Sequence, residues 1–301
     1  MTKPIIAVVG AGLMGHGIAQ VLAVAGHDVR VHDPVPEALA ALHERVRANL
    51  EVLEQDPAAL ERIEAVPDLA DAVRDAGVVI EAVPEKLDLK RSIFAQVERH
   101  APEGAILASN TSVIPIGEIM RGLRRPERAL GTHWWNPPFL VPLVEVIGTP
   151  ETAPEFVAAT IELLQAVGKT PVHVQKDVPG FVGNRLQHAL WREAIALVQE
   201  GVCDALTVDT VVKASFGRRL AVLGPLENAD LVGLDLTLDI HEHVLPALDR
   251  SPGPLPILKE KVAAGTLGMK TGEGFRSWTP EEANALRRRV VEYLKAFRPP
   301  S

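Results

Sequence analysis

One histidine and one glutamate in this chain stand where they could form an acid–base pair. His133 lies in the stretch THWWNPP (132–138), and Glu145 is the central residue of the apolar segment LVEVI (143–147). An imidazole titrates near neutral pH and can remove the proton of a hydroxyl group. A carboxylate inside an apolar strand needs a partner, and His133 is the best candidate. The two residues therefore predict general acid–base catalysis, with a purely structural histidine in a tight aromatic turn as the alternative.

Three glycines near the N-terminus have the spacing of a nucleotide-binding turn. Gly10, Gly12 and Gly15 form G-x-G-x-x-G between an apolar strand and a helical segment. In such a turn, glycines allow a sharp bend, a close approach of a pyrophosphate to the backbone, and tight packing of helix on strand. The helix N-terminus then faces the phosphates. We predict a dinucleotide site that also includes Leu13 and Met14; a glycine-rich turn without a ligand is the alternative.

The end of the second predicted strand indicates which cofactor to expect. The strand DVRVHD (28–33) ends in Asp33. A carboxylate at this place accepts hydrogen bonds from the adenosine ribose hydroxyls and repels a 2′-phosphate. No arginine follows directly, because the next residues are Pro34, Val35 and Pro36. The sequence therefore predicts NAD rather than NADP.

The elements around these residues change in type along the chain. In the first half, short apolar strands alternate with helical segments, which is the pattern of βαβ units and a mainly parallel sheet. After DVPGFVGN (177–184), long helical patterns dominate. We predict an α/β fold with a Rossmann-type NAD-binding domain over residues 1–178 and a smaller all-helical domain over residues 179–301. A chain of 301 residues is long enough for both domains.

Composition argues against several other classes of function. The net charge of −8 disfavours a nucleic-acid binder, because phosphate contacts need a basic surface. No stretch reaches the roughly 20 apolar residues of a spanning helix, so we expect a soluble protein without a membrane partner. Cys203, the only cysteine, permits no intrachain disulfide or thiolate cluster and fits a reducing, cytoplasmic setting. His241 and His243 would project from different faces of a helix, so we predict no metal site.

Seven short motifs extend, in order, over nearly the whole chain: GAGLMGHGIA, SNTSVIPI, GTHWWNPP, LVEVI, KDVPGFVGNRL, GPLENADLVGLD and KTGEGF. Together they resemble the L-3-hydroxyacyl-CoA dehydrogenase family, which includes non-CoA relatives such as carnitine, L-gulonate and pyridine-carboxylate dehydrogenases. The resemblance implies NAD-dependent, reversible oxidation of the hydroxyl of a 3-hydroxy acid or 3-hydroxyacyl-CoA to the 3-oxo product, as in fatty acid metabolism. It also implies a homodimer formed through the helical substrate domain.

The resemblance assigns roles to particular residues. His133 matches the catalytic base, and Glu145 matches the acid that pairs with it. The residues implied at the reacting centre are Ser112 and Asn184, and those implied in the substrate pocket are Asn136, Trp134 and Trp135. The residues implied at the cofactor are Glu85, Lys90, Asn110 and Lys270. Simpler roles stay open: a turn cap for Ser112 and Asn110, a helix N-cap for Asn184, and a solvated surface lysine for Lys270.

Two features depart from the acyl-CoA members of this family. Such members typically carry a lysine-rich helical arm after the second strand, near the CoA phosphates. Here segment 37–66 has a net charge of −4, with the acids Glu37, Glu44, Glu51, Glu54, Asp56, Glu61 and Glu64 and the bases Arg45, Arg47 and Arg62. The pair after His133 is Trp-Trp instead of the common Phe-Phe, which predicts a narrower or reshaped pocket. A CoA thioester and a free small acid therefore both stay open as substrates.

Two other classes of protein also stay open. A 6-phosphogluconate-like 3-hydroxyacid dehydrogenase would use a lysine in the helix between its domains, and the corresponding segment here, GFVGNRLQHALWREA, has none. The alternative from a different class is an NAD-binding protein with a structural or sensing role, as in lens crystallins. The intact pair of His133 and Glu145 argues against that alternative.

Overall fold

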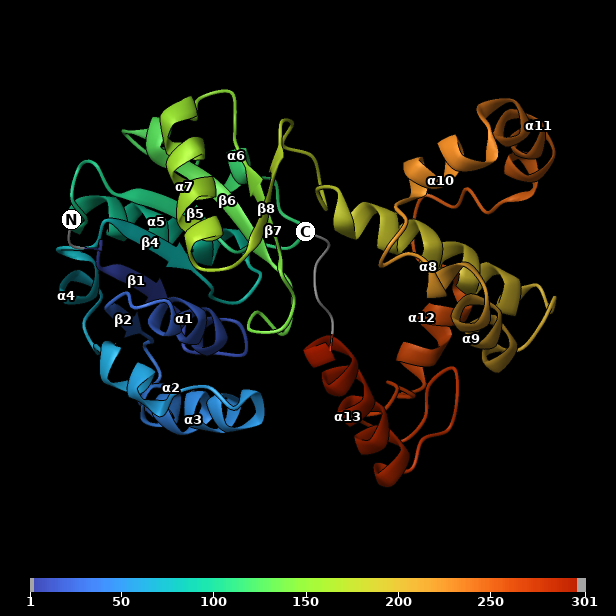
Figure 1. The fold of residues 1–301 in the computed structure, drawn as a ribbon, viewed down its shortest axis with the longest axis horizontal. Helices are drawn as coiled ribbons and strands as arrows, with labels where there is room; N and C mark the ends of the chain where they lie inside the picture. The colour runs from blue at the N-terminus through green and yellow to red at the C-terminus, as the bar shows by residue number, and fades with distance from the viewer. Residues whose placement is uncertain (1–2, 297–301) are drawn as a thin grey trace. The chain divides into compact units, whose positions relative to one another are not determined.

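The structure is a computed structural model that describes residues 3–296 (Figure 1). The chain divides between Arg185 and Leu186 into two compact units. The first unit is a sheet with helices on both faces, and the second is built from helices. The predicted fold class, a Rossmann-type α/β domain followed by a helical domain, is confirmed. Residues 297–301, the end of the predicted second domain, lie outside the described range.

The first unit contains one eight-stranded sheet with the strand order β3-β2-β1-β4-β5-β6-β7-β8. Neighbouring strands are parallel except for β6 and β7, which are antiparallel. The strand order reverses between β1 and β4, and in open sheets of this kind ligands bind at the carboxyl ends of the strands beside such a reversal. The strands are β1 (Ile6–Val9), β2 (Val29–His32), β3 (Ile63–Ala65), β4 (Val78–Glu81), β5 (Ile106–Ser109), β6 (Ala129–Trp134), β7 (Leu143–Ile147) and β8 (Thr170–Val174).

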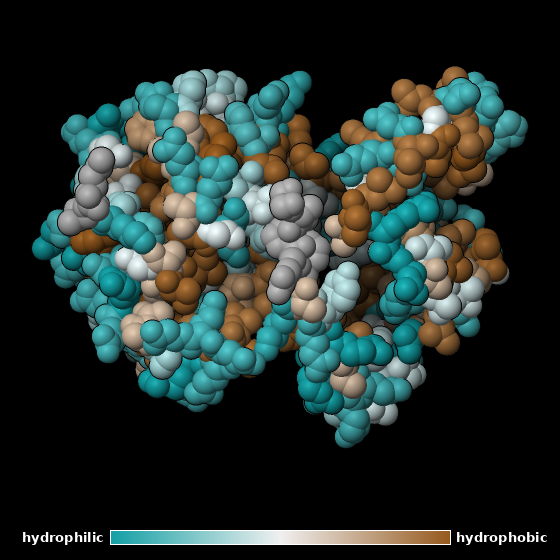
Figure 2. All heavy atoms as spheres, in the orientation of Figure 1, coloured by the Kyte–Doolittle hydropathy of each residue, from teal (hydrophilic) through white to brown (hydrophobic). Residues whose placement is uncertain are grey.

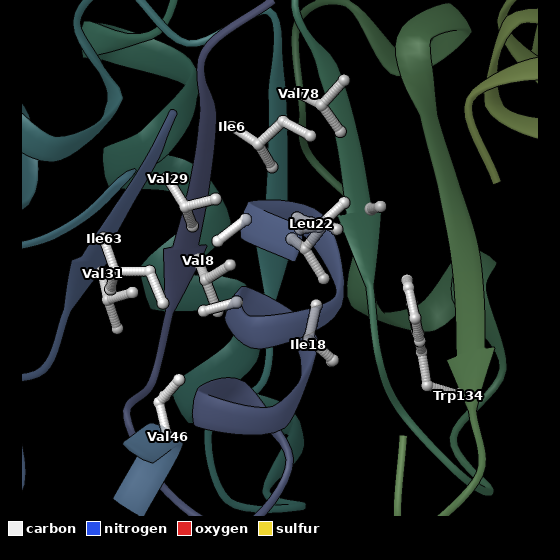
Figure 3. Close-up of a cluster of buried hydrophobic side chains, with 14 of the residues drawn as sticks. Ile6, Val8, Ile18, Leu22, Val29, Val31, Val46, Ile63, Val78 and Trp134 are labelled. Atoms are coloured by element: carbon white, nitrogen blue, oxygen red, sulfur yellow. The ribbon is translucent and has the colours of Figure 1, made fainter. Parts of the chain in front are cut away.

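Helices cover both faces of the sheet and enclose two hydrophobic cores. Because side chains of a strand alternate between its faces, Ile6 and Val8 of β1 enter the first core, and Ala7 and Val9 enter the second. The first core packs against α1, α3 and α7, and part of it is drawn in Figure 3. The second packs against α4, α5 and α6. These helices, with the short α2, are α1 (Gly15–Val24), α2 (Pro36–Ala40), α3 (Leu42–Leu53), α4 (Leu69–Val73), α5 (Leu87–His100), α6 (Ile116–Ile119) and α7 (Pro154–Ala166).

The second unit leaves much of its apolar surface uncovered. The helices α9 to α12 contain no buried residue within the part of the chain that the structure describes. Leu226 is 80% exposed and Leu231 is 72% exposed, and hydrophobic side chains are visible over these helices in Figure 2. The helices are α8 (Gly183–Gln199), which begins in the first unit, α9 (Ala205–Ala214), α10 (Pro225–Val232), α11 (Leu234–Val244), α12 (Pro256–Ala263) and α13 (Pro280–Ala296). Of the described helices, none has the length and apolar character that a bilayer crossing requires.

Segment 37–66 is not one continuous helix. The helix α3 ends at Glu54, which has a left-handed backbone with φ of 56°. Pro57 then begins a short 3₁₀ helix (Pro57–Arg62), because a proline cannot continue the hydrogen bonding of an α-helix. The segment ends in β3, which pairs in parallel with β2 at the edge of the sheet. A strand of three residues is too short to show an alternating pattern in the sequence.

Candidate active site

The glycine turn at the end of β1 has the shape that a pyrophosphate needs. Gly10 has φ of +111°, and a Cβ there would lie 2.6 Å from the carbonyl oxygen of Ala82. A Cβ on Gly15 would lie 1.7 Å from the carbonyl oxygen of Gly10, so α1 begins in direct contact with the turn. A Cβ on Gly12 would meet nothing within 4 Å, which leaves the backbone open to a ligand. The predicted glycine roles therefore fit a dinucleotide cofactor.

Asp33 lies directly after β2 and bonds to the same turn. Its Oδ2 accepts a hydrogen bond from the Ala11 amide at 2.8 Å, and its Oδ1 accepts one from the Val35 amide at 2.9 Å. Beside it, Leu13 is 67% exposed at the tip of the turn, while Met14 packs against the first core. The carboxylate expected at the adenosine ribose thus also fixes the glycine turn.

His133 and Glu145 form a buried pair across two strands. They are direct partners in the antiparallel register of β6 and β7. Nδ1 of His133 lies 2.7 Å from Oε2 of Glu145, and the residues are 4% and 1% exposed. Because a carboxylate only accepts hydrogen bonds, Nδ1 carries the proton and Nε2 keeps a free lone pair. The arrangement leaves Nε2 able to accept a proton from a substrate.

The second oxygen of Glu145 joins this pair to the start of α8. Oε1 accepts hydrogen bonds from the amides of Val182 at 2.9 Å and Gly183 at 3.0 Å. Burial acts to raise the pKa of Glu145, but the hydrogen bonds from His133, Gly183 and Val182 outweigh it, and the pKa is lowered. Glu145 is therefore held as a carboxylate, the form that stabilises a protonated imidazole.

Glu85 holds the loop that contains Ser112. Its Oε1 accepts hydrogen bonds from the Thr111 hydroxyl and from the amides of Ser112 at 3.0 Å and Val113 at 3.2 Å. Burial acts to raise the pKa of Glu85, and these hydrogen bonds with the nearby charge of Lys90 lower it overall. The side chain thus organises the loop after β5 as an anion.

Lys90, which the resemblance implied in contact with the cofactor or beside it, has a buried side chain. Its side chain is completely buried, with Nζ 2.7 Å from Glu81 and 3.3 Å from Glu85. Glu81 also accepts a hydrogen bond of 2.6 Å from the Ser109 hydroxyl. Lys90 therefore acts on the site through Glu85, because a buried ammonium group must stay close to its carboxylate partners.

Asn110, predicted at the cofactor, and Asn184, predicted at the reacting centre, both bond to backbone groups. Oδ1 of Asn110 accepts a hydrogen bond from the Trp134 amide at 2.9 Å, next to His133. Nδ2 of Asn184 donates to the Ser112 carbonyl at 2.8 Å. The helix α8 begins at Gly183, so the N-cap interpretation of Asn184 is wrong. Asn184 instead links the start of α8 to the Ser112 loop.

The two tryptophans have different surroundings. Trp135 lies beside His133, with ring centroids 5.2 Å apart, and packs on Gly183, where a Cβ would be 2.4 Å from its Cζ2. Trp134 is 2% exposed and belongs to the first hydrophobic core, where Figure 3 shows its ring. Trp134 therefore does not line a pocket with His133, contrary to our expectation. Asn136 is exposed directly after this pair.

Lys270 is exposed in the turn between Gly268 and Gly272 of the second unit.

Three residues that the sequence did not predict lie at the site in the first unit: Glu81, Thr111 and Phe181. The ring centroid of Phe181 is 5.6 Å from that of His133. Glu81 carried a usable signal, because it is an acid inside the apolar run GVVIEAV, as Glu145 is inside LVEVI. Thr111 and Phe181 carried none, since their contacts depend on the fold.

A glycine turn beside the strand reversal, with a buried histidine–glutamate pair farther along the same sheet, fits an NAD-dependent dehydrogenase. Residues 5–178 match the NAD-binding domain of 3-hydroxyacyl-CoA dehydrogenase, and residues 180–278 match its C-terminal domain. The chain belongs to the 3-hydroxyacyl-CoA dehydrogenase family, as the sequence motifs predicted.

Relatives of the chain include enzymes with and without CoA in their names. The 5-formyl-3-hydroxy-2-methylpyridine 4-carboxylate 5-dehydrogenase of Mesorhizobium japonicum is 38% identical over 97% of this chain and 96% of that protein. The probable 3-hydroxybutyryl-CoA dehydrogenase of Bacillus subtilis is 39% identical over 90% of this chain and 96% of that protein. A solved structure of the pyridine-carboxylate dehydrogenase, described as an NAD+-dependent dismutase, matches with a TM-score of 0.91 at 36% identity, covering 98% of this chain and 97% of that chain.

Proposed function

We propose that this dehydrogenase oxidises a small free acid, of the hydroxy-acid or pyridine-carboxylate type, rather than a CoA thioester. The observation that carries the proposal is that two of the three arginines in segment 37–66 already have partners within the protein. Arg45 donates to the Ala11 carbonyl at 3.3 Å, and Arg62 pairs with Asp28 at 2.9 Å. Of the three arginines, only Arg47 makes no such contact with the described residues.

The same segment is unfavourable for a ligand with several phosphate charges. Its seven acids and three arginines give a net charge of −4, so negative charge dominates the local field. Like charges repel most strongly where solvent screening is weak, and a CoA moiety would bring its phosphates to this surface. A small free acid would have no group that reaches the segment.

The pyridine-carboxylate relative supports the same choice, because a protein whose named substrate is a free acid matches 97% of this chain, against 90% for the Bacillus relative. The helix α13 (Pro280–Ala296) does not separate the two candidates. A solved 3-hydroxyacyl-CoA dehydrogenase structure also covers 97% of the chain.

The residues of the site divide the chemistry of this reaction. His133 takes the proton of the substrate through Nε2, and Glu145 stabilises the imidazolium that forms. The glycine turn and Asp33 would hold NAD, whose nicotinamide would supply the acceptor for the hydride of the substrate carbon. Ser112 and Asn136, both exposed, provide polar groups that hold the substrate, and Trp135 limits its size beside His133.

Oxidation of a 3-hydroxyacyl-CoA is the second candidate, favoured by the 39% identity to the Bacillus protein. Steady-state kinetics, followed by NADH absorbance, separates the two. We expect kcat/KM for a free hydroxylated or formylated pyridine carboxylate to exceed that for 3-hydroxybutyryl-CoA by about 10²-fold or more, with 3-hydroxybutyrate and carnitine completing the panel. Turnover of the thioester alone would contradict the proposal.

A pair of substitutions on α3 makes this comparison sharper. Glu44 and Glu51 are exposed acids of that helix. Replacing both with lysine should raise kcat/KM for the thioester several-fold and leave the free acid unchanged, because only the thioester carries phosphates to this surface. No change for either substrate would remove the acidic segment as the reason for the choice.

We further propose that the second unit forms a homodimer. Its helices α9 to α12 bury none of their described residues, and most of their leucines and valines are exposed (Figure 2). Apolar patches of this kind usually mark association surfaces. Light scattering at micromolar concentration should give twice the chain mass of 32.4 kDa, and Leu226→Glu with Leu231→Glu should return the monomer. A monomeric unsubstituted protein would count against this proposal.

We also propose a cytoplasmic location. If the substrate is a 3-hydroxyacyl-CoA, we propose a role in fatty acid metabolism. Cys203 is a free thiol, and a chain without an intrachain disulfide suits a reducing compartment. Fluorescence microscopy of a tagged protein in its host tests the location.

A further inference from the structure

Lys169 is a mostly buried cation that the proposed reaction does not use. It lies between α7 and β8, and its Nζ donates hydrogen bonds to the carbonyls of Pro138 and, at 3.0 Å, Val141. The same Nζ is 5.4 Å from the centroid of the Trp134 ring, a cation–π distance. Its partners are therefore all in or beside the segment that follows His133.

No carboxylate pairs with this lysine anywhere in residues 3–296. Burial without a counter-charge lowers the pKa of Lys169 to about 8. An unpaired buried ammonium group is unfavourable, so its retention needs the two carbonyls and the indole ring as compensation. The three contacts together tie the lysine to one segment of backbone.

That segment, residues 137–142, connects the two strands of the acid–base pair. The amides of Leu140 and Val141 both donate to the Pro137 carbonyl at 3.0 Å, which makes a compact turn. The turn also rests on α1, because a Cβ on Gly17 would lie 2.6 Å from Cγ of Pro138 and 3.2 Å from Cδ1 of Phe139. The turn therefore touches the helix that begins at the cofactor site.

We propose that Lys169 is a positioning residue that fixes turn 137–142 against α1 and so sets the distance between the histidine strand and the cofactor helix. Within the described residues, Lys169 makes no hydrogen bond or ion pair with His133 or Glu145. It acts through the carbonyls of Pro138 and Val141, which follow Asn136 in the chain. The expected effect of Lys169 on turnover rests on the proposed function. Its expected effect on the structure of turn 137–142 is independent of that function.

Two substitutions and a control test this role. Lys169→Met keeps an unbranched apolar side chain but removes the donors, and Lys169→Arg restores a cation with several donors. The control is Lys3→Met, because Lys3 also donates to a backbone carbonyl, that of Ala25 at the end of α1, but does not touch the turn. Amide hydrogen exchange at Leu140 and Val141 measures the turn itself.

We expect exchange at these two amides to rise at least about ten-fold in Lys169→Met and to return toward the original rate in Lys169→Arg. We expect kcat per NADH-binding site to fall about ten-fold or more, since hydride transfer is sensitive to small displacements, with the Kd of NADH unchanged within about two-fold. Lys3→Met should change neither the exchange rates nor kcat.

Unchanged amide exchange in Lys169→Met overturns the inference, and so does faster amide exchange with unchanged kcat. If the enzyme turns over none of the proposed substrates, the proposed function fails while the exchange rates still decide whether Lys169 fixes the turn.

Discussion

Replacement of His133 with asparagine is expected to lower kcat about 10³-fold while NADH still binds. General acid–base catalysis contributes about 10²- to 10⁴-fold, and asparagine has no group that titrates near neutral pH. Asparagine can still donate to Glu145, so the carboxylate does not lose its cross-strand partner. The glycine turn and Asp33 do not contact His133, so the Kd of NADH should change less than about two-fold.

His173→Asn is the matched control for this substitution. His173 lies on β8 in the same sheet, is exposed, and is not paired with a carboxylate within the described residues. Its replacement should leave kcat within about two-fold of the original. Retention of most activity in His133→Asn would instead exclude His133 as the base.

The fold could be predicted where local pattern and tertiary structure agree. The apolar runs ALGTHW (129–134) and LVEVI (143–147) form the observed β6 and β7. Their apolar residues are buried on both faces of the sheet, so a continuous apolar run was a sufficient signal. The short β3 has no such run, and its position depends on pairing with β2.

The candidate site was predictable in its residue types but less so in its contacts. Side chains alternate along a strand, so the adjacent residues His133 and Trp134 of β6 must point to opposite faces. This rule alone places Trp134 on the face opposite His133, whereas the resemblance to the family had assigned both residues to one pocket. The burial of Lys90 between Glu81 and Glu85 could not be predicted, because it depends on how α5 packs against the ends of β4 and β5.

Glu145→Gln is the second substitution for which we expect a large effect, with kcat lowered about 10³-fold at a nearly unchanged Kd for NADH. A glutamine can accept only through its carbonyl oxygen, and Oε1 of Glu145 already accepts from the amides of Val182 and Gly183. The amide nitrogen would then face Nδ1 of His133, where it donates and favours the tautomer protonated at Nε2. A histidine in that tautomer has no lone pair toward the substrate and cannot remove its proton, as in other histidine–carboxylate pairs.

The pH dependence of stability gives an independent reading of the same variant. The pKa of Glu145 is lowered in the folded chain, so its ionised form stabilises the fold above the ordinary carboxylate range. This contribution is lost as the pH falls through the lowered pKa, and Glu145→Gln should lack that part of the acid destabilisation. The control is Glu151→Gln, since Glu151 is exposed in the turn after β7.

Nitrogen-15 NMR of the imidazole should show the proton on Nδ1 in the original protein and on Nε2 in Glu145→Gln. Full activity of Glu145→Gln with the Nε2 tautomer would show that Glu145 does not prepare His133 for proton removal.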